Sequence, residues 1–216
     1  EGDDGFSISI SGQNNRYNSI YIDGAINNDV FGLAGSGTNG GQTGVSPFSI
    51  DAIEQFQVNI APFDVKQSGF TGGAVNAITR SGTNNIEGST YFFLRNEKLA
   101  GKTPAEIAGG NTRERLGEFT STTYGVRVGG PVIEDKLFFF VNYEKQDEET
   151  PQPFEISRYR GNSSVADIER LRNFTSTTYG FNIGNFDGTK RTLNSDKFTA
   201  KIDWNINEKN TLSLKH

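Results

Sequence analysis

The chain has 216 residues with a formal net charge of -5, and only 33% of them are hydrophobic. This composition excludes helical membrane spans, because no apolar run approaches the roughly 20 residues that a spanning helix needs. The absence of cysteine excludes disulfides and Cys-ligated zinc, and the absence of a basic block disfavours nucleic acid as a partner. The sequence starts at Glu1 without a methionine and stops inside an alternating run, so we expect a piece of a longer protein.

The first predicted region, residues 1–84, is rich in Gly and Asn and contains short apolar runs that are typical of β-strands. The runs lie at residues 6–10, 20–22, 56–60 and 74–79. Between the second and third runs, the glycine-rich stretch 32–41 is too long for a tight turn and predicts a mobile loop. Asp51 is a candidate N-cap for one helical turn that continues to residue 54.

From residue 85 onward, apolar and polar side chains alternate in runs of about ten residues, as they do in outer-membrane strands. The clearest run spans 198–206 and continues after a short turn, which predicts a hairpin. The apolar face of this run, which we expect to touch lipid, consists of Phe198, Ala200, Ile202, Trp204 and Ile206. The opposite face, which we expect to line the barrel lumen, consists of Thr199, Lys201, Asp203 and Asn205.

The predicted connections between strands alternate in length, from 96–122 (long) to 130–135 (short), 147–195 (long) and 207–210 (short). Single-chain membrane barrels have short periplasmic turns and long extracellular loops, so this order favours a barrel. Within the second long connection, residues 164–173 have apolar side chains at helical spacing and predict a short helix. Residues 174–184 are a candidate for an additional hairpin.

The chain offers little catalytic chemistry. Its only histidine is His216, so no internal residue can complete a Ser-His-Asp triad or a His-containing zinc site. The acidic run 144–149 is more typical of a solvated loop start than of an acid–base pair. The glycines at 35–41 lack the residues of a phosphate-binding loop, and the oxygen-bearing side chains around Gly188 do not have EF-hand spacing. We therefore expect no enzyme, no cofactor and no metal site.

Several segments resemble the plug domain and first barrel strands of TonB-dependent outer-membrane receptors, and most closely their Oar-like branch. The similarity begins in residues 53–58 and 69–79 and covers most of 15–145. Its other segments are Ile22-Asp23-Gly24, Asn27-Asn28-Asp29, Ala61-Pro62-Phe63-Asp64, Ser68-Gly69-Phe70-Thr71-Gly72-Gly73, Gly130-Pro131 and Asp135-Lys136-Leu137-Phe138-Phe139-Phe140-Val141-Asn142-Tyr143-Glu144. The resemblance implies a mainly β fold. In this fold, residues 1–84 form a small α+β plug domain and residues 85–216 form part of an antiparallel transmembrane β-barrel.

The resemblance also implies a function: uptake of a peptide, a glycan or a metal chelate through a plugged barrel in the outer membrane of a Gram-negative bacterium. The plug would face the periplasm, and a TonB energy-transducing complex would act on a segment that is absent from this sequence. The other partners implied are outer-membrane lipid, the extracellular ligand and a surface lipoprotein. Two alternatives stay open, a non-transporting structural or adhesive outer-membrane protein and a soluble secreted β-sandwich.

The resemblance points to two sets of site residues. A plug apex loop would bind ligand through Asn27, Asn28, Asp29 and Phe31, since amides beside an aromatic ring suit a polar peptide or glycan. Asn and Asp at these positions also fit ordinary turn geometry. Charges at Glu54 and Arg80 would tie the plug to the barrel wall by ion pairs.

Overall fold

The protein, seen in a computed structural model, is mainly β, as the sequence predicts. The structure describes residues 9–10, 12–60, 71–102, 113, 115–151, 161–184 and 190–216. The expected strand at 6–8, the motif residues 61–64 and 68–70, and the oxygen-bearing residues at 185–188 lie outside these ranges. The chain forms two compact units. The first comprises Glu1–Phe92, Thr123–Gln146 and Ser195–His216, and the second comprises Phe93–Thr122 and Asp147–Asn194.

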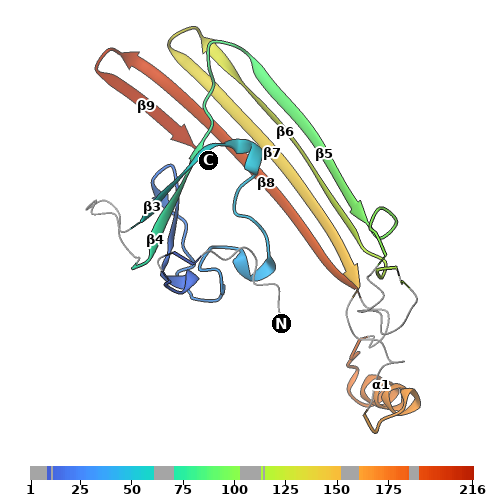
Figure 1. The fold of residues 1–216 in the computed structure, drawn as a ribbon. Helices are drawn as coiled ribbons and strands as arrows, with labels where there is room; N and C mark the ends of the chain where they lie inside the picture. Colours follow the sequence, from blue (N-terminus) through green and yellow to red (C-terminus); the bar gives the residue numbers. More distant parts are fainter. Residues whose placement is uncertain are drawn as a thin grey trace. The chain divides into compact units, whose positions relative to one another are not determined.

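A small mixed sheet, which we call the small sheet, has the strand order β2-β1-β4-β3 (Figure 1). Its strands are β1 (Ser19–Ile22), β2 (Ala25–Ile26), β3 (Ile53–Ile60) and β4 (Gly73–Thr79). Strand β1 runs parallel to β4 and antiparallel to β2, and β3 runs antiparallel to β4. The central strands bury Tyr21, Ala74 and Ala77. The runs predicted at 20–22, 56–60 and 74–79 lie within β1, β3 and β4 and are confirmed as strands.

Three short 3-10 helices interrupt the loops of the small sheet: η1 (Asn15–Tyr17), η2 (Gly41–Thr43) and η3 (Ile50–Ala52). The turn expected at 51–54 is therefore present one residue earlier, and Ser49 rather than Asp51 occupies its N-cap position. The expectation that Asp51 caps this turn is wrong. The Asp51 carboxylate instead accepts hydrogen bonds from Ser89 and Arg127, which belong to a second, five-stranded sheet.

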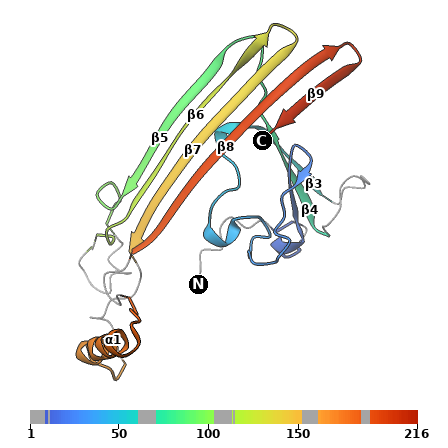
Figure 2. The same ribbon diagram turned by 180° about the vertical axis from the view of Figure 1, so that it is seen from behind.

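A five-stranded sheet, which we call the long sheet, has the order β5-β6-β7-β8-β9 (Figure 1). Its strands are β5 (Glu87–Asn96), β6 (Thr120–Ile133), β7 (Leu137–Pro151), β8 (Lys190–Asn207) and β9 (Asn210–Lys215). The same succession of neighbouring strands is seen from behind (Figure 2). The connections 97–119, 134–136, 152–189 and 208–209 alternate between long and short, as predicted.

The side chains of β8 differ in exposure between its two faces. Phe198, Ile202 and Trp204 are exposed, whereas Lys201 and Asp203 are partly buried. These five positions fit the predicted alternation, whereas Ala200 of the predicted lipid face is partly buried and Asn205 of the opposite face is exposed. The acidic run 144–149 was expected to begin a loop, but it lies within β7, which continues to Pro151.

The second unit contains the helix α1 (Val165–Tyr179). A reciprocal capping box between Ser164 and Asp167 begins this helix, and Gly180 ends it in the left-handed conformation, at φ 64°. The helix predicted at 164–173 is confirmed, and it is longer than expected. The prediction of an additional hairpin at 174–184 is wrong, because α1 continues to Tyr179. In the described part of the chain, every helix is too short or too polar to cross a membrane.

Candidate functional site: polar contacts between the two sheets

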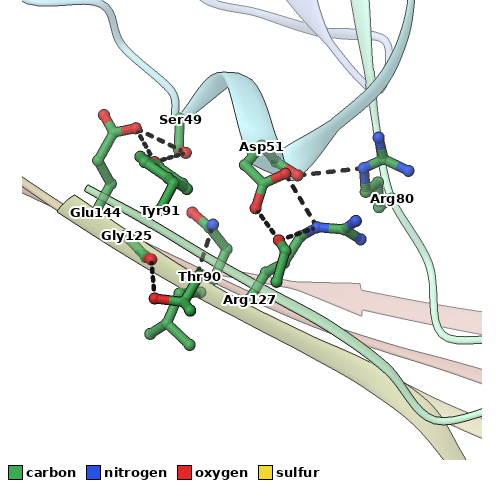
Figure 3. Close-up of polar contacts among 11 residues, drawn as sticks. Ser49, Asp51, Arg80, Thr90, Tyr91, Gly125, Arg127 and Glu144 are labelled. Carbon is green, nitrogen blue, oxygen red and sulfur yellow. Dashed lines mark hydrogen bonds and ion pairs between the residues drawn. The ribbon is translucent and has the colours of Figure 1, made fainter. Parts of the chain in front are cut away.

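Within the first unit, the residues around η3 contact the long sheet through two polar clusters (Figure 3). The first, the Glu144 cluster, consists of Ser49, Tyr91, Glu144 and Lys197. Glu144 Oε2 accepts hydrogen bonds from Ser49 Oγ at 3.0 Å and from the Tyr91 hydroxyl, and Lys197 Nζ donates to Glu144 Oε1 at 2.7 Å. One carboxylate of β7 thereby joins Ser49, the residue just before η3, to β5 and β8.

The Glu144 cluster is buried. Ser49 is 1% exposed, and the side chains of Glu144 and Lys197 are 9% and 11% exposed. An ion pair withdrawn from water holds only when its remaining lone pairs are also satisfied, which Ser49 and Tyr91 do here. The cluster is therefore a well-satisfied contact in which each polar group depends on the others.

The second cluster, the Asp51 cluster, consists of Asp51, Arg80, Ser89 and Arg127. Figure 3 labels Asp51, Arg80 and Arg127. Asp51 accepts from Ser89 Oγ at 2.6 Å and from Arg127 Nε at 3.0 Å. Arg80 Nε donates to the Asp51 backbone carbonyl at 3.2 Å, and the Arg80 amide donates to the Ala52 carbonyl at 2.8 Å. Asp51 therefore links η3 to β5 and β6 through its side chain, while Arg80 fixes its backbone.

A third contact lies at the turn between β1 and β2. Lys215 Nζ pairs with Asp23 Oδ2 at 2.7 Å, and Asp23 also accepts from the amide and the hydroxyl of Thr79. Burial opposes ionisation of Asp23, but the hydrogen bonds from Lys215 and Thr79 outweigh it and lower the pKa of this carboxyl. Asp23 itself has a positive φ of 48°, a conformation that Asp tolerates in turns.

The linker between β4 and β5 is packed against the long sheet. Lys201 Nζ donates to Ser81 Oγ at 2.8 Å, and Asn84 and Asp135 exchange two hydrogen bonds of 2.6 and 2.9 Å. A Cβ atom at Gly82 would lie 2.3 Å from the Phe139 carbonyl oxygen. The backbone of β7 therefore approaches the linker so closely that only glycine fits.

The predicted ligand residues lie together on the loop after β2. Asn28 accepts from the Ile20 amide at 2.9 Å and donates to Ser19 Oγ at 2.8 Å, while Asp29 accepts from amides of its own loop. Asn27 Oδ1 accepts from Asn39 Nδ2 at 3.3 Å. The polar groups of Asn28 and Asp29 thus hold the loop itself, and Phe31 is the exposed member of the set.

Of the residues predicted to tie the two sheets together, Arg80 belongs to the Asp51 cluster, and Glu54 is exposed on β3. Sequence reasoning missed Ser49, Asp51 and Glu144 as contacts. One signal was present, because Asn142 and Glu144 alternate with Val141 and Tyr143 along β7. Asn142 and Glu144 are buried together with Phe140 on one face of that strand.

The chemistry of these clusters is that of attachment rather than of catalysis. They consist of hydroxyls, carboxylates and cations that satisfy one another. Among the residues that the structure describes, no group of three His, Cys, Asp or Glu side chains could hold a metal ion. The arrangement can fix one sheet against another and can release it when its ion pairs are broken.

A family model described as "Outer membrane beta barrel domain" matches residues 78–159. Among curated proteins, the TonB-dependent transporter Oar of Myxococcus xanthus is 30% identical over 147 residues, which are 65% of this chain and 12% of that protein. The chain thus spans a small part of this relative.

Two solved structures share the fold. The outer membrane transporter YddB from Escherichia coli matches 97% of this chain and 26% of its own, with a TM-score of 0.59 and 13% identity. The siderophore receptor PirA from Acinetobacter baumannii matches 97% of this chain and 24% of its own, with a TM-score of 0.54 and 18% identity.

Proposed function

We propose that this chain, a homologue of the TonB-dependent transporter Oar with the fold of outer-membrane transporters, forms the plug and first barrel strands of a ligand-uptake receptor. The similarity to an outer-membrane transporter and to an outer-membrane β-barrel domain supports this interpretation over an enzyme and over a soluble β-sandwich. Residues 1–84 are the proposed plug and 85–216 the proposed barrel segment. The plug and the short turns face the periplasm.

The buried Glu144 cluster supports this proposal most directly. Tyr91 of β5 and Glu144 of β7 bond to Ser49, the residue just before η3, and Lys197 of β8 pairs with the same Glu144 carboxylate. A plug inside a barrel needs such contacts with the inner wall. The opposite face of β8, with Phe198, Ile202 and Trp204 exposed, is the proposed lipid-facing surface.

The proposed uptake has three steps. The ligand binds on the outer side of the plug, where Asn27, Asn28, Asp29 and Phe31 belong to the proposed binding loop. A TonB complex supplies the energy for plug rearrangement, and the contacts of the Asp51 and Glu144 clusters are then broken and re-formed. The proposed ligand is a peptide, a glycan or a metal chelate, and a surface lipoprotein is a proposed auxiliary partner.

The test uses full-length protein in cells that contain or lack TonB. Three probe pools are offered: a tryptic peptide digest, an oligosaccharide mixture and a ferric chelate. We expect at least one pool to be depleted from the medium only when both the receptor and TonB are present. The purified periplasmic domain of TonB should also bind the purified receptor.

The rival is a structural or adhesive outer-membrane protein that has kept the receptor fold. It would deplete none of the three pools in a TonB-dependent manner, and its purified form would not bind the TonB domain. Together these two results would overturn the uptake function while leaving the outer-membrane location unchanged.

A further inference from the structure

Tyr91 and Glu144 are bonded although their strands are not neighbours. The long sheet has the order β5-β6-β7-β8-β9, so β6 lies between β5, which carries Tyr91, and β7, which carries Glu144. Two strands that flank a third lie about 10 Å apart, twice the spacing of neighbouring strands. The Tyr91 side chain therefore has to cross β6 before its hydroxyl can donate to Glu144 Oε2.

Gly125 is the residue of β6 beside which Tyr91 crosses (Figure 3). A Cβ atom at Gly125 would lie 2.4 Å from the Tyr91 hydroxyl oxygen and 2.5 and 2.7 Å from two carbons of its ring. Any other amino acid at this position would therefore displace the ring. Gly125 is buried, and a glycine inside a strand commonly marks a place that another group approaches closely.

The Tyr91 ring cannot move aside without losing its partners. Its hydroxyl lies 3.2 Å from Ser49 Oγ and donates to Glu144. Beside it on β5, Thr90 donates its hydroxyl to the Gly125 carbonyl at 3.2 Å, which fixes β5 against β6 at the crossing point. Displacement of the ring would therefore break the hydrogen bonds of the Tyr91 hydroxyl rather than merely rotate a free side chain.

Three of the four side chains of the Glu144 cluster belong to the long sheet. We call these three residues, Tyr91, Glu144 and Lys197, the socket. Tyr91 donates to one oxygen of the Glu144 carboxylate and Lys197 to the other. Ser49 adds a neutral hydroxyl to this arrangement. If Ser49 leaves, water can take the place of its hydroxyl and the ion pair keeps both charges, so that no buried charge is stranded.

The Asp51 cluster has a different distribution of charge. Asp51 belongs to η3, in the proposed plug, and its ion pair with Arg127 of β6 spans 3.0 Å. Detachment of the plug separates two opposite charges at this cluster, whereas at the socket it removes only a hydroxyl. The socket is therefore the contact that can stay assembled through such a movement.

We propose that Gly125, by admitting the Tyr91 ring, makes the socket a preformed docking site for Ser49. The plug docks through one neutral hydroxyl, and it leaves and returns while Tyr91, Glu144 and Lys197 stay joined. Gly125 is thus a positioning residue that acts through Tyr91. The inference rests on the proposed plug and its rearrangement, and it names the residue of the long sheet that sets the docking site.

The test measures amide hydrogen exchange of the full-length protein in lipid vesicles, followed by mass spectrometry of the segment 49–53. The Ala52 amide donates to the Ser49 carbonyl at 3.1 Å, so exchange in this segment reports its local opening. Gly125→Ala should speed this exchange by about tenfold, because the displaced ring loses its hydrogen bonds. Exchange in β1 and β4 should stay at the wild-type rate.

A double-mutant cycle shows whether Gly125 acts through Tyr91. Tyr91→Ala should also speed exchange at 49–53, and Gly125→Ala should add nothing in that background, because the new methyl group occupies the space left by the ring. The matched control is Gly101→Ala, where a Cβ atom meets nothing within 4 Å, and it should leave the exchange unchanged. Tyr91→Phe keeps the ring and loses the hydroxyl, so it should speed exchange at 49–53 even where Gly125→Ala folds poorly.

A separate variant tests whether the socket is preformed. Ser49→Ala should speed exchange at 49–53 and leave the denaturant midpoint of the whole protein close to that of the wild type. A midpoint lowered as far as in Glu144→Gln would overturn the proposal, because the socket would then depend on the plug.

Two further results would overturn the role of Gly125. One is an equal effect of Gly125→Ala in the wild-type and Tyr91→Ala backgrounds. The other is acceleration that extends over β1 and β4, which would indicate general unfolding. None of these measurements depends on ligand uptake. A structural protein with the same plug would show the same exchange pattern and would still deplete none of the three probe pools.

Discussion

At the scale of single residues, Glu144 joins two other strands of the long sheet to the residue that precedes η3. Its carboxylate accepts hydrogen bonds from Ser49 and from Tyr91 of β5 and pairs with Lys197 of β8, and the side chains of Glu144 and Lys197 are only 9% and 11% exposed. A buried ion pair gives little net stability when intact, because desolvation offsets the attraction. Loss of one partner is costly, since the other charge is then left buried and unpaired.

Glu144→Gln should therefore lower the free energy of unfolding of the full-length protein by about 3 kcal/mol, because Lys197 loses its counter-ion. A denaturant titration of the protein in lipid vesicles measures this loss. The matched control is Asp196→Asn, which removes a carboxylate from the exposed pair with Lys145. That change should cost at most about 1 kcal/mol. Equal losses for the two variants would show that the Glu144 cluster is solvated.

Asp23 makes the contact with Lys215 dependent on pH. A carboxyl group whose pKa is lowered by folding adds stability above its unfolded pKa, and this stability is lost as the pH falls through the folded pKa. Asp23 has such a lowered pKa. The stability difference between the wild type and Asp23→Asn should stay constant from neutral pH to about pH 5. It should then close progressively as the pH falls below the ordinary value of 3.8.

This pH dependence is measured by repeating the unfolding titration of both proteins at a series of pH values. A difference that grows as the pH falls would contradict the sign derived for Asp23. A difference that is absent at neutral pH would show that the contact with Lys215 contributes nothing to the fold.

At the scale of elements, the linker between β4 and β5 is held as tightly as a strand. Asn84 and Asp135 bond reciprocally, and Gly82 leaves no room for a side chain beside the β7 backbone. Gly82→Ala should therefore destabilise the protein by about 1–3 kcal/mol through overpacking. The control is Gly101→Ala, where a Cβ atom meets nothing within 4 Å. Limited proteolysis at the linker, together with thermal unfolding, measures the effect. Identical behaviour of the two variants would contradict the close approach.

The two faces of β8 should respond differently to substitution. Ile202→Arg on the proposed lipid face should cost about 2–4 kcal/mol near the middle of the membrane, because a cation enters hydrocarbon. Lys201→Ala on the opposite face loses an exposed hydrogen bond to Ser81 and a 3.7 Å ion pair with Asp203, and it should be mild. A folding titration into vesicles measures both. Equal costs, or spin labels at 200, 202 and 204 that report a uniformly aqueous environment, would contradict the proposed facing.

Elements with strong local patterns were predictable from the sequence. The alternation along β8, the hairpin with β9 and the long and short connections follow from local periodicity and turn residues, and the structure contains all three. Helix α1 was predicted shorter than it is, because Phe174 and the threonines after it suit a strand as well as a helix. Ser164 and Gly180 set the true limits of the helix.

The contacts between the sheets were not predictable in the same way. Ser49 and Glu144 are 95 residues apart, and their meeting depends on the register of strands that local pattern does not specify. The acidic run 144–149 therefore resembled a loop start. Glu54 and Arg80 were predicted through a family resemblance, and of the two Arg80 belongs to the Asp51 cluster. Their role as a plug–barrel ion pair stays a prediction.

At the scale of the whole molecule, the proposed plug closes a pore. Deletion of residues 9–79 from the full-length protein removes the small sheet and leaves the long sheet intact. Cells that produce this variant should become sensitive to vancomycin, an antibiotic too large to cross an intact outer membrane. Vesicles that contain it should release small sugars. Equal amounts of wild-type protein should do neither. A deletion variant that reaches the membrane and remains impermeable would contradict a plug within a barrel.

Helix α1 begins and ends through signals in its own sequence, and none of its residues is buried. Its amino acids are therefore constrained chiefly by the need to remain helical and soluble. Such a segment can drift between bacterial strains much faster than the strands around Glu144. In the proposed topology the connection that contains α1 is extracellular, so α1 is also a position at which to graft a foreign epitope for display on the cell surface.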